Sequence, residues 1–175
     1  MSFDADVIVA GAGPAGATAA RRLAHAGMRV LIVERFALPR QKPCGGGIST
    51  RVFARFPYLQ AALARIPHLP VSSLYLEGPS GDVFRMRSNG PAVVLIRRIE
   101  FDHLLAKLAI EAGAELVAPA AVAQAQQDAD SVMLKLRDGR RLRAPIVIAA
   151  DGRMARGPSC ARHDGGNAGR QPADV

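Results

Sequence analysis

Apolar positions in the first part of the chain form two continuous runs, separated by a glycine-rich turn and a helical stretch. Residues 7–10 and 29–33 are almost wholly aliphatic, as expected for parallel strands that are buried on both faces. Between them, residues 14–26 read as a helix that stops at Gly27, because glycine commonly follows the last helical turn. This order predicts a β-α-β unit.

Periodic patterns return further along the chain. Residues 73–77 and 82–87 alternate around a Gly-Pro-Ser-Gly turn, which predicts a β-hairpin. From residue 100, apolar side chains recur at helical spacing as far as Gly113. The remaining expected strands are residues 115–118, 132–136, 140–143 and 146–150, the last of them buried and followed by Asp151-Gly152.

The first turn carries glycines at the spacing of a dinucleotide fingerprint. Gly11 allows the tight turn, Gly13 lets the backbone approach a pyrophosphate, and Gly16 lets the helix pack closely on the strand. The first helical amides then face the anion. Glu34 follows about 20 residues on, where a carboxylate accepts hydrogen bonds from ribose hydroxyls and disfavours the 2′-phosphate of NADP. The chain is therefore expected to bind the ADP half of a dinucleotide.

Composition excludes several classes of protein. The net charge is +8, but the arginines are spread along the chain and aromatic residues make up only 5%, so we expect a solvated basic surface and no nucleic-acid partner. The histidines show no ligand spacing, so no metal site is expected. Asp4 and Asp6 argue against a signal peptide, and no apolar run approaches a membrane span. Cys44 and Cys160 give no disulfide framework, which favours a cytoplasmic location.

Three motifs make the chain resemble the flavoprotein group that contains geranylgeranyl reductases and para-hydroxybenzoate-hydroxylase-type monooxygenases. The first is the fingerprint GAGPAG, with Pro14 and Ala15 inside it, a form similar to that of FAD-binding members. The second is Arg98, placed three residues before Phe101-Asp102. The third is the apolar strand that ends in Asp151-Gly152. The resemblance implies that FAD is the bound cofactor.

Residues 39–47 discriminate within this group. Their sequence PRQKPCGGG resembles the PxxKxCGGG signature of geranylgeranyl reductases, which reduce isolated C=C bonds of prenyl chains. The resemblance implies that Cys44 lies near the flavin as a catalytic residue. Three consecutive glycines cannot form a helix or a stable strand, so we expect Gly45, Gly46 and Gly47 to form a loop that approaches the cofactor ring. Without the resemblance, the same residues read as a flexible surface loop with an incidental cysteine.

The resemblance also implies a set of cofactor-binding residues. The set comprises Gly11, Gly13, Pro14, Ala15, Gly16, Glu34, Arg35, Gly45, Gly46, Arg98, Val122, Asp151 and Gly152. Val122 is placed near the adenine through its backbone alone. Two readings from the residues themselves stay open, because Arg98 could be a solvated charge before a helix and Asp151 a turn-forming residue.

By resemblance, the fold class is α/β: a truncated, Rossmann-like FAD/NAD(P)-binding three-layer fold with a parallel sheet, helices and a small antiparallel β-meander. We expect residues 1–47 and 96–152 to form a discontinuous FAD-binding domain, and residues 48–95 a partial substrate-domain insertion with the hairpin. Residues 153–175 depart from the family's DGxxSxxR pattern at Ala155 and Pro158 and show no apolar periodicity. We expect this tail to be disordered or frame-shifted.

The resemblance implies the FAD-binding portion of an oxidoreductase that reduces C=C bonds of prenyl chains by hydride transfer from reduced flavin. NAD(P)H or a ferredoxin is the expected electron donor. A prenyl lipid or prenylated small molecule is the expected substrate, with peripheral membrane association as a consequence. Two alternatives remain: an FAD-dependent aromatic monooxygenase of the same fold, and a catalytically inactive, truncated nucleotide-binding remnant.

Overall fold

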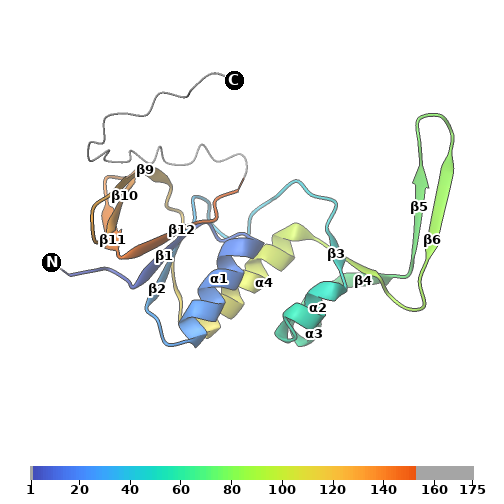
Figure 1. The fold of residues 1–175 in the computed structure, drawn as a ribbon, viewed down its shortest axis with the longest axis horizontal. Coiled ribbons are helices and arrows are strands. Elements are labelled where there is room, and N and C mark those ends of the chain that lie inside the picture. The colour runs from blue at the N-terminus through green and yellow to red at the C-terminus, as the bar shows by residue number, and fades with distance from the viewer. Residues whose placement is uncertain (1, 153–175) are drawn as a thin grey trace, which may run out of the picture.

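A four-stranded parallel sheet has the strand order β12-β1-β2-β8, and its strands β12, β1 and β2 lie side by side in Figure 1. The computed structural model describes residues 2–152, so the expectation about residues 153–175 lies outside the described residues. The two inner strands, β1 (Val7–Ala10) and β2 (Val30–Val33), are wholly buried. The edges are β8 (Glu115–Val117) and β12 (Ile146–Ala149). The β-α-β unit predicted from the apolar runs is confirmed.

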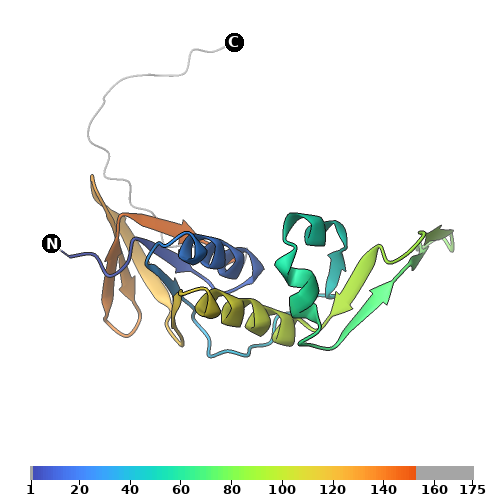
Figure 2. The same cartoon turned by 90° about the horizontal axis from the view of Figure 1, so that it is seen from below.

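Alternation along the inner strands gives the sheet two packed faces. Val9 and Ile32 pack toward the helix layer, which consists of α1 (Pro14–His25) and α4 (Arg98–Glu111) lying side by side (Figures 1 and 2). Ile8 and Leu31 share the opposite core with Leu134. That side is covered by an antiparallel meander of β9 (Val122–Gln127), β10 (Val132–Leu136) and β11 (Arg141–Ala144). The three-layer fold is confirmed.

Residues 48–95 contain short elements that extend away from these layers. One antiparallel sheet holds β3 (Gly47–Ser49), β7 (Val93–Ile96) and β4 (His68–Val71), next to α2 (Arg51–Arg55) and α3 (Tyr58–Leu63). Leu59 and Val94 share a core with Phe101 and Leu105 of α4. The base of this region is therefore packed against the helix layer, while the division into two domains stays a prediction.

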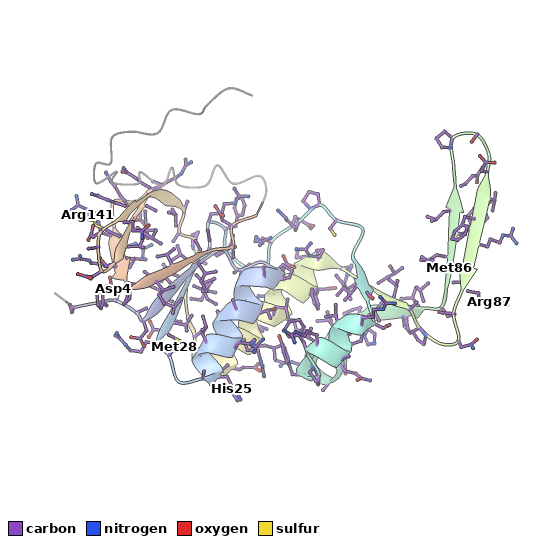
Figure 3. The ribbon with its side chains drawn as sticks, viewed as in Figure 1. Asp4, His25, Met28, Met86, Arg87 and Arg141 are labelled. Carbon is purple, nitrogen blue, oxygen red and sulfur yellow. The ribbon has the colours of Figure 1, made fainter. Side chains whose placement is uncertain are left out.

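The predicted hairpin is present as β5 (Ser73–Glu77) and β6 (Val83–Arg87). It projects from the body, and Met86 and Arg87 lie on it far from the three layers (Figure 3). Every residue of both strands is exposed. No helix within residues 2–152 is long and apolar enough to span a bilayer.

Two expectations about strands are wrong. Residues 146–150 were expected to form a buried strand, but Ile146 is 51% exposed because β12 lies at an edge of the described sheet. Gly47 was expected in a loop, yet it begins β3 and pairs with Leu95. Its backbone hydrogen bonds to a neighbouring strand outweigh the low strand propensity of glycine.

Candidate functional site

Two glycines bring the ends of β1, α1 and β12 into close contact. A Cβ atom on Gly16 would overlap the carbonyl oxygen of Gly11. A Cβ on Gly11 would lie 2.6 Å from the carbonyl oxygen of Ala150, and Gly11 also has a φ of +107°. Only glycine fits both positions without backbone movement.

The first turn of α1 has free backbone donors. Its N-cap residue is Gly13, which makes no side-chain cap, and Pro14 in the first turn has no N–H. The first helical hydrogen bond runs from the Ala17 amide to the Gly13 carbonyl, so the amides of Ala15 and Gly16 have no acceptor within the helix. No acidic side chain lies in this turn. The helix end thus offers N–H groups and a positive dipole end to an anion.

Glu34 is fixed beside this turn by backbone hydrogen bonds. The amide of Ala12 donates to Glu34 Oε2 at 2.8 Å, and the amide of Phe36 donates to Oε1 at 3.2 Å. The residue is only 3% exposed. Oε1 accepts the one hydrogen bond from the Phe36 amide, so it keeps a lone pair that could accept a hydrogen bond from a ribose hydroxyl.

Arg40 is a site residue that the sequence reasoning missed. Its Nη2 donates to Glu34 Oε2 at 3.5 Å, and its Nη1 lies 3.4 Å from Asp102 Oδ2. Its Nε lies 3.2 Å from Glu34 Oε1 but is a buried donor without a hydrogen bond. A Cβ on Gly13 would lie 3.7 Å from Arg40 Nη2. The only signal in the sequence was its place within residues 39–47, which drew attention to the cysteine alone.

Arg98 is anchored by Asp102, one helical turn further along α4. Arg98 donates to this fully buried carboxylate from Nε at 2.7 Å and from Nη2 at 2.9 Å. These hydrogen bonds raise the pKa of Arg98. Its side chain is only 17% exposed, so the reading of Arg98 as a solvated charge is wrong.

Cys44 lies in the loop between β2 and β3, close to Arg98. The Gly46 amide lies 3.5 Å from Cys44 Sγ and donates to it. This hydrogen bond lowers the pKa of the Cys44 thiol, and the nearby Arg98 guanidinium lowers it further. Gly46 is required here, since its φ is +74° and a Cβ would overlap the carbonyl oxygen of Ile96. A Cβ on Gly45 would meet nothing within 4 Å.

Cys44 and Arg98 both line a cavity of about 740 Å³ between the helix layer and the base of residues 48–95. Pro14 and Ala15 of the α1 turn line it as well. The rest of the wall is largely apolar and includes Ile48, Val52, Phe56, Leu59, Phe101 and Leu105. The cavity size is in the usual range of about 300–1,000 Å³ for small-molecule sites.

Comparison with known proteins places this geometry in a family. Residues 4–165 match the FAD binding domain family. The chain belongs to that family. An FAD-binding domain requires an ADP cradle, and the free α1 amides, the anchored Glu34 carboxylate and the glycine contacts fit one.

Several relatives are similar over most of the chain. It is 35% identical to a menaquinone reductase of Mycobacterium tuberculosis, covering 90% of this chain and 40% of that protein. It is 39% identical to digeranylgeranylglycerophospholipid reductase 1 of Methanopyrus kandleri, covering 87% and 40%. A rifampicin monooxygenase of Streptomyces venezuelae is 31% identical, with 84% and 32% covered. The chain thus spans 40% or less of the length of these relatives.

A solved structure shows the same fold. A geranylgeranyl bacteriochlorophyll reductase-like protein from Thermoplasma acidophilum superposes with a TM-score of 0.75 at 29% identity. The match covers 85% of this chain and 39% of that one. The resemblance to geranylgeranyl reductases seen in the sequence motifs is confirmed.

The Asp151-Gly152 motif meets the cradle from β12. A Cβ on Gly11 would lie 2.8 Å from Asp151 Cα. Lys42 Nζ lies 4.0 Å from the position of a Cβ on Gly152. Lys42 is half-buried, and within residues 2–152 it has no hydrogen bond or ion pair. An unpaired ammonium group therefore lies beside the second glycine motif of the FAD-binding domain.

Two predicted cofactor residues lie apart from this group. Arg35 is exposed, and its guanidinium lies 4.6 Å from the centre of the Phe36 ring. Val122 begins β9 and packs against the core cluster that contains Val33. A cofactor role for either residue stays a prediction. Val122 follows Ala120 by two residues, and the Ala120 amide donates a hydrogen bond to the Glu34 carbonyl.

Proposed function

We propose that this FAD-binding domain serves an oxidoreductase that reduces C=C bonds of prenyl chains. The observation that carries the proposal is the cavity, where Cys44 and Arg98 meet a largely apolar wall. The transfer of an uncharged hydrocarbon chain from water to such a wall lowers its free energy. The relatives support this substrate class. Two of them are named as reductases of menaquinone and of digeranylgeranylglycerophospholipid, and both of these molecules carry prenyl chains.

FAD, once reduced by NAD(P)H or a ferredoxin-type donor, would supply the hydride for one carbon of the double bond. The residues of the chain bind and orient the reactants. The α1 amides and Lys42 would bind the diphosphate, and Glu34 would accept a hydrogen bond from the ribose. The other carbon needs a proton, and the Cys44 thiol is the acid that lines the cavity. Its lowered pKa favours proton donation, and solvent can reprotonate the exposed residue.

The test uses this chain directly. The purified protein is titrated with FAD, reduced without oxygen, and incubated with geranylgeranyl diphosphate. Mass spectrometry should find a product with two added hydrogens for each reduced bond, in proportion to the flavin oxidised. Bound FAD with no product would contradict reduction of prenyl double bonds by this chain.

Monooxygenation is a second candidate, favoured by the similarity to rifampicin monooxygenase. In that case the reduced protein should consume oxygen in the presence of a phenolic substrate and form a hydroxylated product. Oxygen consumption coupled to hydroxylation, together with unchanged prenyl substrate, would replace the reductase proposal.

A further inference from the structure

Four charged side chains form an unbroken chain through the FAD-binding site. Glu34 contacts Arg40, Arg40 contacts Asp102, and Asp102 accepts two hydrogen bonds from Arg98. The charges alternate in sign, and the side chains range from fully buried to 17% exposed. Removal of one partner from such a chain leaves its neighbours with uncompensated buried charge.

The two ends of this ion-pair chain reach different parts of the site. At one end, Glu34 is bonded to the Ala12 amide of the fingerprint turn. At the other, Arg98 lines the same cavity as Cys44, and its guanidinium lowers the pKa of the Cys44 thiol. Arg40 and Cys44 share the irregular loop between β2 and β3. Arg40 therefore ties the middle of this loop to both carboxylates.

We propose that Arg40 and Asp102 are positioning residues that join the adenosine end of the FAD site to the Cys44 end. Arg40 suits this task, because its planar guanidinium presents different nitrogens to Glu34 and Asp102, whereas a lysine ammonium has all three donors on one nitrogen. Asp102 then holds Arg98 in its orientation, and the position of the Arg98 guanidinium determines the electrostatic potential at the Cys44 thiol. The inference rests on the proposed function only in taking FAD as the ligand.

The first experiment needs no flavin. Alkylation of Cys44 by iodoacetamide is measured against pH in the ligand-free protein, with peptide-resolved mass spectrometry to separate Cys44 from Cys160. In Arg40→Gln, Asp102 loses one compensating cation, so its negative charge raises the pKa of the thiol and the alkylation profile moves to higher pH. Arg97→Gln is the matched control, since Arg97 is 70% exposed and pairs with Glu100 on the surface. Its profile should match that of the unchanged protein.

The second experiment measures affinity for FAD and for ADP. Arg40→Gln should weaken both by about tenfold, the usual effect of losing a hydrogen bond to a charged group. The double variant Arg40→Gln/Asp102→Asn should lose no more affinity than the single variant that binds more weakly, because the two residues act through each other. Arg40→Lys keeps the charge but not the bridge, so its affinity should fall as well. It also provides a folded alternative if Arg40→Gln does not fold.

The outcomes separate this inference from the proposed function. If the unchanged protein does not bind FAD, the proposed function fails, while the Cys44 profile still judges the ion-pair chain. If FAD binds but Arg40→Gln leaves the Cys44 profile unchanged, or Arg40→Lys leaves the affinity for FAD unchanged, the coupling is refuted. If the fold-losses of affinity in the two single variants multiply in the double variant, the two residues act independently and the coupling is also refuted.

Discussion

The amide of Ala12 donates a 2.8 Å hydrogen bond to Oε2 of Glu34 across 22 residues of sequence. This bond joins the glycine turn after β1 to the carboxylate that ends β2. The carboxylate is therefore held in one orientation before any ligand arrives, which would lower the ordering cost of binding a ribose hydroxyl.

Glu34→Gln tests this carboxylate. The variant keeps one acceptor oxygen but loses the negative charge, so ADP affinity should fall by about tenfold. Titration calorimetry with ADP measures the change. Glu115→Gln, on the exposed start of the neighbouring β8, is the control and should bind as the unchanged protein does. Equal affinity in both variants would remove Glu34 from the site.

Gly16→Ala tests the close contact of α1 with the end of β1. The new Cβ would overlap the carbonyl oxygen of Gly11, so the backbone must shift and the free energy of unfolding should fall by about 3 kcal/mol. Urea unfolding followed by circular dichroism measures it. Gly45→Ala adds a Cβ that meets nothing within 4 Å and should change stability little. A tolerated alanine at position 16 would show that the contact is not tight.

The lowered pKa of Cys44 predicts a pH dependence. The thiolate is the reactive form, so a lowered pKa moves half-maximal alkylation to a pH below that of the same cysteine in the urea-unfolded chain. Arg98→Gln removes one cause and should move the profile back toward higher pH. A profile equal to that of the unfolded chain would show that neither Gly46 nor Arg98 acts on the thiol.

Lys42→Gln tests the unpaired ammonium group beside Gly152. Loss of a cation near the diphosphate should lower the affinity for FAD and for ADP by about tenfold. It should also reduce the salt dependence of binding. Stability should not change, because Lys42 has no hydrogen bond or ion pair within the described part of the chain. Lys107→Gln removes an exposed lysine of α4 as the control. Unchanged ADP affinity in Lys42→Gln would place the ammonium outside the diphosphate site.

The elements that could be predicted are those whose own residues decide their structure. β1, α1 and β2 follow from aliphatic runs and a glycine stop, and the β5–β6 hairpin follows from alternation around a turn. β3 and β4 carry no such signal, because they are short, partly exposed and stabilised by pairing with β7. The exposure of Ile146 could not be read locally either, since an edge position depends on the whole sheet.

The site shows the same division. The fingerprint glycines and Glu34 have fixed spacing, because a single β-α-β unit positions them. Arg40 has no such spacing. Its role depends on the path of an irregular loop that brings its guanidinium between Glu34 and Asp102. Asp102 was visible as part of a motif, but its burial and its two arginine partners required the packed structure.

Equilibrium titration of the purified chain with FAD decides whether this domain binds the cofactor at the fingerprint turn. One FAD should bind per chain with saturation, seen as a change in flavin fluorescence, and ADP should displace it and Glu34→Gln should weaken it. A chain that leaves the fluorescence of FAD unchanged, or binds FAD without competition from ADP, would show that the turn and Glu34 do not form the FAD site.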